Sequence, residues 1–207
     1  ITENTMKVQG VIPSEEYDPD EMESLDVLIS DFAAAMTRDN ITMAAIKEHF
    51  KKGSGKKPVS KTGFSSATKY SSVTFEDEAY VLGAPEFVLK ENYEDYAETI
   101  TEYASKGARV LVFGTYDGEI DGKPLKHAVT PLAYILLANP IREAAKETFE
   151  YFEEQGVEVK VISGDNPVTV SRVAKQAGIR NAGNYVDASE LETPEQMEKA
   201  LLNNTVF

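Results

Sequence analysis

The sequence predicts an α+β domain, an antiparallel sheet flanked by helices, inserted in an incomplete α/β domain with a parallel sheet. Two observations predict this arrangement. Up to about residue 130, helical periodicity comes first and short strand-like runs with turn signals follow. From Pro131 onward, apolar strand-like runs alternate with helical patterns, as in βαβ units. The predicted boundaries are 9–131 for the inserted domain, and 1–8 with 132–207 for the α/β domain.

The inserted domain is expected to begin with two helices. Asp18 is a candidate N-cap, and apolar residues then recur at helical spacing as far as Met36. A second, shorter helix is expected to start near Asn40. The segment 51–58 is rich in lysine and glycine but lacks the G-x-x-x-x-G-K spacing of a phosphate-binding loop. We therefore interpret it as an exposed basic loop.

Short strands complete the inserted domain. An acidic turn, Glu76-Asp77-Glu78, separates two strand-like runs, and Gly107 suits the C-terminus of a helix. The expected elements are strands at 70–75 and 79–82, a helix at 93–106 and a strand at 108–116.

The second region alternates between strands and helices. Thr193 and Gln196 form a capping box that is expected to open the last helix. Alternating β-branched residues in 157–162 predict a buried parallel strand. The expected elements are strands at 132–138 and 157–162, and helices at 142–155, 167–177 and about 194–203.

A polar loop, Ser163-Gly164-Asp165-Asn166, lies between the predicted strand 157–162 and the helix that follows it. Open α/β sheets bind ligands at the carboxyl ends of their strands, and helix N-termini attract anions. The loop offers a hydroxyl, a glycine that lets backbone come close, and a carboxylate, which together indicate phosphate handling. The alternative interpretation is that these residues only cap the helix.

Composition argues against several classes of protein. The 207-residue chain has a net charge of −14, whereas nucleic-acid and anionic-lipid binding call for a basic surface. With no cysteine and two histidines, a metal site of its own is not expected. The longest apolar run, 132–138, is far below the roughly 20 residues of a membrane helix. We expect a monomer that neither binds nucleic acid nor inserts into a membrane.

Several motifs occur in a fixed order along the chain. They are Phe64-Ser65-Ser66 with Lys69, Leu82-Gly83-Ala84-Pro85-Glu86, Gly107-Ala108-Arg109-Val110-Leu111, Asn139-Pro140-Ile141-Arg142 and Ile162-Ser163-Gly164-Asp165-Asn166. Together they resemble the F-S-x-x-x-K, K-G-A-x-E, G-L-R-V-L, D-P-P-R and T-G-D-N motifs of the P-type ATPases. The chain looks most like a bacterial cation pump of that family.

This resemblance implies a fold and a function. The α/β domain would be part of a haloacid dehalogenase-like, Rossmann-like phosphorylation domain, and the inserted domain would bind ATP on the cytoplasmic side of the membrane. The family forms an aspartyl-phosphate within D-K-T-G-T and uses magnesium. That motif is expected to precede Ile1, so the chain should bind ATP but should not hydrolyse it. Its other partners would be the remaining domains of the pump. Ser60-Lys61-Thr62-Gly63 imitates the motif, but serine replaces the aspartate.

The resemblance also implies a nucleotide pocket. Phe64 would stack on adenine beside Lys69, and Arg109 would reach the phosphates. Leu82 stands where the family has a lysine, so the pocket would lose a cation and gain an apolar wall. Gly83 and Ala84 would form the pocket floor. Asn40 and Thr42 correspond more loosely to an acidic motif at the pocket edge.

The phosphorylation half would contribute the second set of residues. Ser163 would donate a hydrogen bond to the transferred phosphoryl group. Gly164 and Asp165 would position that group, and Asn166 would help orient the catalytic loop. Asn139 and Arg142 would lie at the junction between the domains.

Two alternatives stay open. A free-standing phosphatase of the haloacid dehalogenase type would need an aspartate nucleophile after a buried strand, yet the one D-x-D sequence, Asp18-Pro19-Asp20, follows polar residues. A non-catalytic acidic interaction domain would explain the charge but none of the ordered motifs.

Overall fold

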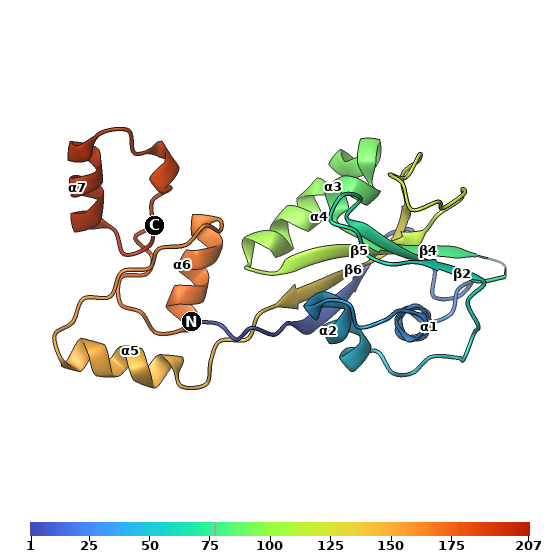
Figure 1. Cartoon of the computed structure of the whole chain (residues 1–207), viewed down its shortest axis with the longest axis horizontal. Coiled ribbons are helices and arrows are strands. Elements are labelled where there is room, and N and C mark those ends of the chain that lie inside the picture. Colours follow the sequence, from blue (N-terminus) through green and yellow to red (C-terminus); the bar gives the residue numbers. More distant parts are fainter. Residues whose placement is uncertain (77) are drawn as a thin grey trace. The chain divides into compact units, whose positions relative to one another are not determined.

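The computed structural model describes residues 1–76 and 78–207, so Asp77 of the predicted acidic turn lies outside the described residues. The chain divides into two compact units (Figure 1). The sheet unit comprises residues 5–104 and 108–138. The helical unit comprises residues 1–4, 105–107 and 139–207. The functional division at residues 9–131 stays a prediction.

The sheet unit is built on a six-stranded sheet in the order β1-β6-β5-β4-β3-β2, in which every neighbouring pair is antiparallel. This confirms the predicted α+β domain with an antiparallel sheet. The strands are β1 (Lys7–Pro13), β2 (Ser60–Thr62), β3 (Tyr70–Thr74), β4 (Ala79–Gly83), β5 (Arg109–Thr115) and β6 (Thr130–Ala138).

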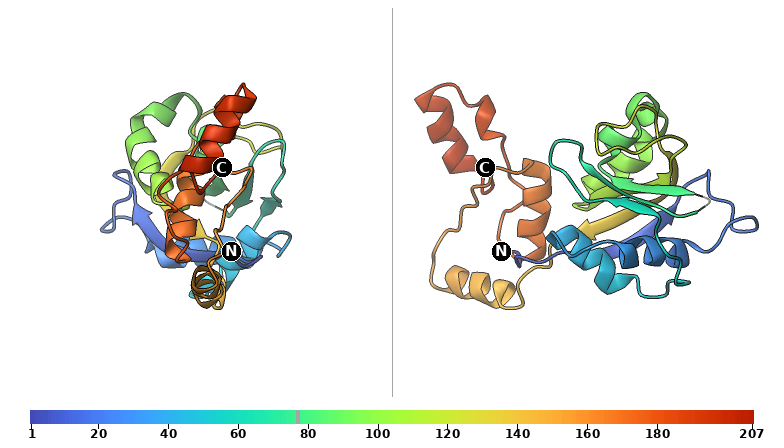
Figure 2. Two further views of the ribbon diagram at one scale, coloured as in Figure 1. Left: turned by 90° about the vertical axis from the view of Figure 1, so that its left-hand side faces the viewer. Right: turned by 45° about the vertical axis from the view of Figure 1, so that its right-hand side comes forward.

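Helices cover both faces of this sheet (Figures 1 and 2). One face carries α1 (Leu25–Ala35) and α2 (Ile41–His49), and the other carries α3 (Pro85–Val88), η1 (Lys90–Asn92) and α4 (Tyr93–Ser105). Side chains alternate along a strand, so each strand contributes to both cores. In β4, for example, Leu82 packs with α1 and α2, whereas Val81 packs with α3 and α4.

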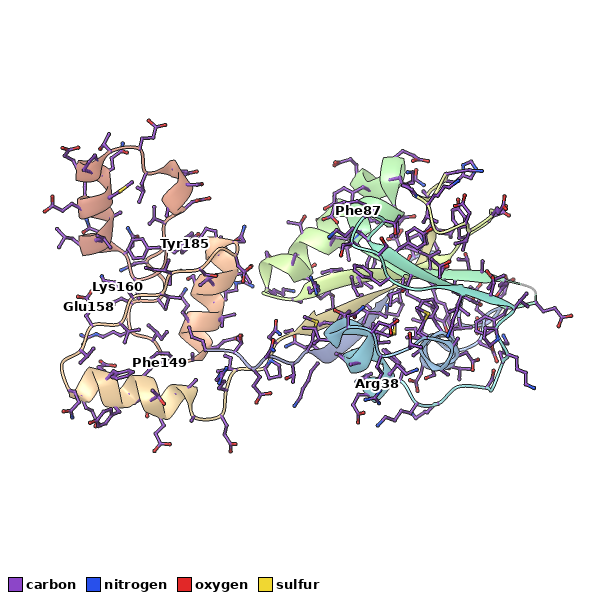
Figure 3. The ribbon with its side chains drawn as sticks, viewed as in Figure 1. Arg38, Phe87, Phe149, Glu158, Lys160 and Tyr185 are labelled. Carbon is purple, nitrogen blue, oxygen red and sulfur yellow. The ribbon has the colours of Figure 1, made fainter. Side chains whose placement is uncertain are left out.

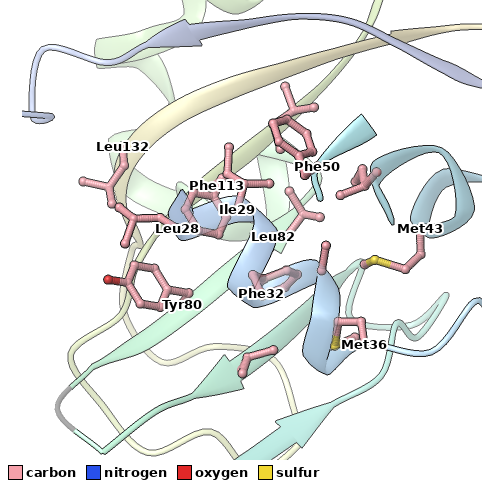
Figure 4. Packing of buried hydrophobic residues seen from close by; sticks show 14 of the residues in the cluster. Leu28, Ile29, Phe32, Met36, Met43, Phe50, Tyr80, Leu82, Phe113 and Leu132 are labelled. Atoms are coloured by element: carbon pink, nitrogen blue, oxygen red, sulfur yellow. The ribbon is translucent and has the colours of Figure 1, made fainter. Parts of the chain in front are cut away.

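The core beneath α1 and α2 contains an aromatic centre (Figure 4). The ring of Phe113 lies 5.4 Å from the ring of Tyr80 in a stacked arrangement, and 5.6 Å from the edge-on ring of Phe32. Aromatic pairs in these geometries contribute about 0.5–1.5 kcal/mol beyond the area that they bury. This centre therefore fixes α1 on β4 and β5.

The first helix begins later than the sequence predicts. The Asp18 carbonyl accepts from the Met22 N–H at 3.0 Å, and the Asp18 carboxylate accepts from the Asp20 N–H at 2.9 Å, which closes a single turn. The helix itself starts at Leu25, where the Ser24 hydroxyl caps the N–H of Val27. The prediction of a cap at Asp18 is wrong, because this carboxylate is used inside the turn.

Strand β6 was predicted to be parallel and lies instead in the antiparallel sheet, between β1 and β5. Its residues 131–137 are all buried, since helices cover both faces of the sheet. A continuous apolar run is typical of parallel strands with two covered faces, and an antiparallel strand covered on both faces has the same pattern. The assignment of 132–138 to a parallel sheet is therefore corrected.

The helical unit contains three main helices and a small core centred on the second of them. They are α5 (Ala145–Glu154), α6 (Pro167–Gln176) and α7 (Pro194–Asn203), with a short helix η2 (Ala188–Glu190). Val170 and Ala174 of α6 are buried with Ile179 and Val206. Asn166 caps α6, and Thr193 with Gln196 caps α7 as predicted.

The predicted strand at 157–162 is almost absent. One parallel bridge joins Val161 to Val206, and a second joins Tyr185 to Val206. Val161 donates to the Thr205 carbonyl and accepts from the Phe207 N–H, both at 2.8 Å. Parallel pairing is thus confirmed, but a buried strand is not. The exposed fractions of Val157 (50%) and Ile162 (83%) show that little packs on this segment in the described chain.

Candidate functional site

The predicted pocket floor lies at the end of β4. Leu82 is 3% exposed and packs in the core beneath α1 and α2 (Figure 4), so its side chain faces protein. Gly83 faces the opposite side of the sheet. A Cβ there would lie 2.6 Å from Val88 Cγ1 and 2.8 Å from the Lys69 carbonyl oxygen. Close packing against α3 therefore requires the glycine, whether or not a ligand approaches it.

The segment that carries Phe64 and Lys69 is a compact turn. The Lys69 N–H donates to the Ser65 carbonyl at 2.7 Å, and Lys69 has a positive φ of 57°. The Ala84 N–H donates to the Lys69 carbonyl at 3.0 Å, which joins this turn to the end of β4. Phe64 is 48% exposed, so an apolar ring face is accessible to a planar ligand.

Arg109 lies at the start of β5, and its side chain is exposed. Its Nη1 donates to the Thr42 hydroxyl at 3.3 Å. The Asn40 side chain accepts from the Met43 N–H at 2.8 Å and so caps α2. The contact between Arg109 and Thr42 spans 67 positions, and no local sequence pattern signals it.

The structure thus forms two groups from the predicted pocket residues. One joins Lys69 to Gly83 and Ala84 through β3 and β4, and the other joins Arg109 to the first turn of α2. The two groups lie on neighbouring strands, because Gly83 of β4 pairs with Val112 of β5, three residues after Arg109.

The loop 163–166 is held by hydrogen bonds to Phe207, within the loop itself and to the first turn of α6. The Ser163 N–H donates to the Phe207 carbonyl at 2.9 Å, and its hydroxyl accepts from the Asp165 N–H at 3.2 Å. Asn166 Oδ1 accepts from the N–H groups of Val168 and Thr169 at 3.0 and 3.4 Å. Helix capping therefore occupies the Asn166 oxygen, whereas Gly164 and the Asp165 carboxylate are exposed to solvent.

The segment around Asn139 and Arg142 pairs with the chain start. Arg142 donates through Nε to the Thr2 carbonyl at 2.9 Å and through its backbone N–H to the Ile1 carbonyl at 3.0 Å. Glu3 donates to the Pro140 carbonyl at 2.8 Å. Asn139 is exposed. The guanidinium thus fixes the start of the helical unit.

A cavity of about 240 Å³ in the helical unit was not predicted. Phe149, Val159 and Ile179 form its apolar part, and an ion pair between Arg180 and Glu153 at 3.2 Å lies at its polar side. Figure 3 labels Phe149 of this lining together with Glu158, which forms an ion pair with Lys160. No motif marked the lining residues, because they come from separate segments of the chain.

Across residues 1–76 and 78–207, no group of three histidine, cysteine, aspartate or glutamate side chains could hold a metal ion. Asp165 alone does not form a magnesium site.

No helix formed by residues 1–76 and 78–207 is long and apolar enough to cross a membrane.

Comparisons with known proteins place these sites in context. A family model described as haloacid dehalogenase-like hydrolase matches residues 2–202. Calcium-transporting ATPase CtpE of Mycolicibacterium smegmatis is 36% identical over 209 residues, which cover 100% of this chain and 25% of that protein. Probable cation-transporting ATPase exp7 of Streptococcus pneumoniae is 35% identical over 97% of this chain and 25% of that protein. The chain therefore spans about a quarter of these relatives.

Solved structures show the same fold. A zinc-transporting PIB-type ATPase matches with a TM-score of 0.64 and 17% identity, over 86% of this chain and 26% of that one. A second structure of a zinc-transporting PIB-type ATPase, in another state, matches with a TM-score of 0.60. These two structures show the fold alone, and the identity to the cation-transporting ATPases CtpE and exp7 confirms the resemblance to the P-type cation pumps that the ordered motifs indicated.

Proposed function

The chain belongs to the haloacid dehalogenase-like hydrolase family, and we propose that it is the ATP-binding cytoplasmic part of a cation-transporting P-type ATPase. One observation carries this proposal: the alignment to calcium-transporting ATPase CtpE runs through the whole chain. The parent protein would couple ATP hydrolysis to ion transport through an aspartyl-phosphate. Its other domains would be the protein partners of this chain.

The sheet unit would bind the nucleotide. The accessible face of Phe64 suits adenine, and aromatic stacking of a base contributes about 1–3 kcal/mol. The Arg109 guanidinium would contact the phosphates, since it can donate two parallel hydrogen bonds to an anion. Lys69 would add a second cation beside the ring, while Gly83, Ala84 and Leu82 would shape the adjoining strand end.

The helical unit would serve phosphoryl transfer. The Ser163 hydroxyl would donate to the transferred group, and Asp165 would orient it from the exposed loop. In the complete site, a magnesium ion bound with ATP would neutralise part of the charge on the phosphate groups. Since Asp165 is an isolated carboxylate, the residues of this chain would position the group and would not hold the metal by themselves.

Titration of the isotope-labelled chain with ATP tests the nucleotide site. We expect weak binding, with a Kd on the order of 1 mM. NMR shifts should concentrate on the amides of Phe64, Lys69, Gly83 and Arg109. Shifts clustered on the basic loop around Gly53–Lys56 would contradict the assignment, because that loop would then be an unspecific phosphate contact.

The phosphatase alternative makes a different prediction in the same sample. A free-standing phosphatase would hydrolyse p-nitrophenyl phosphate, whereas an ATP-binding part of a pump would not. Hydrolysis that persists after Phe64→Ala but disappears after Asp165→Asn would favour the phosphatase.

A further inference from the structure

Arg109 is held by a neutral side chain in an acidic protein. The formal charge of the chain is −14, yet the guanidinium Nη1 donates to the Thr42 hydroxyl at 3.3 Å. Among the described residues, no carboxylate forms an ion pair with Arg109. Its charge is therefore not neutralised within the sheet unit.

The Thr42 hydroxyl is itself fixed in orientation. Its O–H donates to the sulfur of Met6 at 3.7 Å, which leaves the oxygen lone pairs free to accept from Arg109. Thr42 is the second residue of α2, and the Asn40 cap holds that first turn through the Met43 N–H. A capped helical turn thus presents one acceptor to the guanidinium.

A hydroxyl and a carboxylate would have different effects on Arg109. Either can orient the guanidinium, but a carboxylate would also cancel its charge. A guanidinium has five N–H donors, so the bond to Thr42 leaves others for a second acceptor. An arginine that is oriented and still fully charged suits a polyanion, which this acidic chain would otherwise repel.

We propose that Thr42 is a positioning residue that holds Arg109 toward the phosphates of the nucleotide without neutralising it. This inference rests on the proposed function, because Arg109 can act on phosphates only if the sheet unit binds a nucleotide. Thr42 acts through Arg109 and does not itself contact the ligand.

The test compares ATP with adenosine, which lacks phosphates, on the whole 207-residue chain. Thr42→Val keeps the shape of the side chain but removes the acceptor. It should weaken ATP binding about 5-fold, the effect of one lost hydrogen bond, and should leave adenosine binding unchanged. Thr42→Ser should bind ATP as the wild type does.

A double-mutant cycle separates positioning from general damage. In the Arg109→Ala background, Thr42→Val should have no further effect on ATP binding, because the residue that it positions is gone. Arg109 is exposed, so Arg109→Ala is expected to fold, which keeps the cycle informative even if Thr42→Val lowers stability.

Three results would overturn the role of Thr42 and leave the proposed function intact. They are normal ATP binding by Thr42→Val, a Thr42→Val effect on ATP binding that is as large in the Arg109→Ala background as in the wild type, and a loss of adenosine binding by Thr42→Val that equals its loss of ATP binding. A wild-type chain that binds neither ATP nor adenosine would overturn the proposed function, and the role of Thr42 would fail with it. A chain that binds adenosine and ATP equally would refute the phosphate contact itself.

Discussion

At the scale of single residues, Gly83 has a packing role that its motif does not reveal. An added methyl group would lie 2.6 Å from Val88 Cγ1 and 2.8 Å from both the Lys69 carbonyl oxygen and Tyr70 Cβ. Two of these three contacts cannot move without shifting β3. We expect Gly83→Ala to lower the free energy of unfolding by about 1–3 kcal/mol, measured by urea denaturation.

Gly10 provides the matched control for this substitution. It also lies in a strand of the same sheet, but a Cβ there would meet nothing within 4 Å. Gly10→Ala should therefore leave stability unchanged or raise it by up to about 1 kcal/mol, because alanine restricts the unfolded chain. A Gly83→Ala variant that is fully stable but no longer binds ATP would show that the glycine serves the ligand and not the packing.

Lys47 shows how one side chain completes a helix. Its ammonium donates to the Ala33 and Met36 carbonyls at 2.5 and 2.6 Å, where α1 ends. Burial lowers the pKa of Lys47, and the nearby charges of Arg38 and Lys61 add to this effect. We expect Lys47→Met to cost about 1–2 kcal/mol of stability, because it removes the ammonium donor from both carbonyls and leaves Ala33 with only the Met36 N–H at 3.2 Å.

Lys51 is the comparison for Lys47. It pairs with Glu48 at 2.7 Å, but both side chains are mostly exposed, and such pairs contribute less than about 1 kcal/mol. Lys51→Met should therefore leave the urea midpoint almost unchanged. Equal effects of the two substitutions would mean that lost lysine charge, and not the helix cap, determines stability.

At the scale of elements, the strands of the sheet bury several tyrosines. Tyr134 of β6 is 3% exposed, and burial raises its pKa to about 12, with smaller contributions from Tyr96, Glu15 and Glu16. Burial also raises the pKa of Tyr70, whose hydroxyl donates to the Lys123 carbonyl at 2.6 Å.

These shifts predict a loss of stability in alkali. Unfolded tyrosine ionises near pH 10, so the folded state binds more protons than the unfolded state between about pH 10 and 12. Stability that is complete below pH 10 is lost as the pH rises through this range. Between pH 9 and pH 11.5, the urea midpoint of Tyr134→Phe should fall by less than that of the wild type. An equal fall would show that Tyr134 does not contribute.

Local signals in the sequence predict some elements much better than others. The caps at Asn166 and Thr193 predict α6 and α7 almost to the residue, since capping depends on neighbours within three positions. Sheet membership depends on distant segments. The apolar run of β6 could not reveal whether its neighbouring strands are parallel or antiparallel to it. The sequence of segment 157–162 is typical of a strand, yet in the described structure a single residue of the segment, Val161, forms a bridge.

Some features of the candidate site could likewise be predicted from the sequence, and others could not. The exposed ring of Phe64 and the turn at Lys69 agree with a role that the motif suggested. Sequence reasoning could not foresee that Leu82 lies in the core, because its burial is set by α1 and α2, which end 47 and 33 positions before it along the chain. It also could not foresee the bond between Arg109 and Thr42.

At the scale of the whole chain, we expect ATP binding without phosphoryl transfer. Transfer to protein needs a nucleophile held in line with the γ-phosphate and a metal that neutralises its charge. Asp165 is exposed in a loop that follows a single-residue bridge, and the described residues form no cluster of three histidine, cysteine, aspartate or glutamate side chains that could hold a metal ion. Ser60 lies in the edge strand β2, opposite Thr74, and is exposed to solvent.

Incubation with γ-labelled ATP and magnesium, followed by acid precipitation, measures this directly. The 207-residue chain should carry no acid-stable label, neither the hydroxylamine-sensitive label of an aspartyl-phosphate nor the hydroxylamine-resistant label of a phosphoserine. Ser60→Ala and Asp165→Asn should give the same background as the wild type. Label that disappears in Ser60→Ala would show that Ser60, in the segment that imitates D-K-T-G-T, accepts the phosphoryl group. Label that disappears in Asp165→Asn would place the nucleophile in the loop at 163–166. We assign Asp165 only a positioning role. The reason is that a carboxylate without a neighbouring metal ligand cannot offset the repulsion between itself and the γ-phosphate.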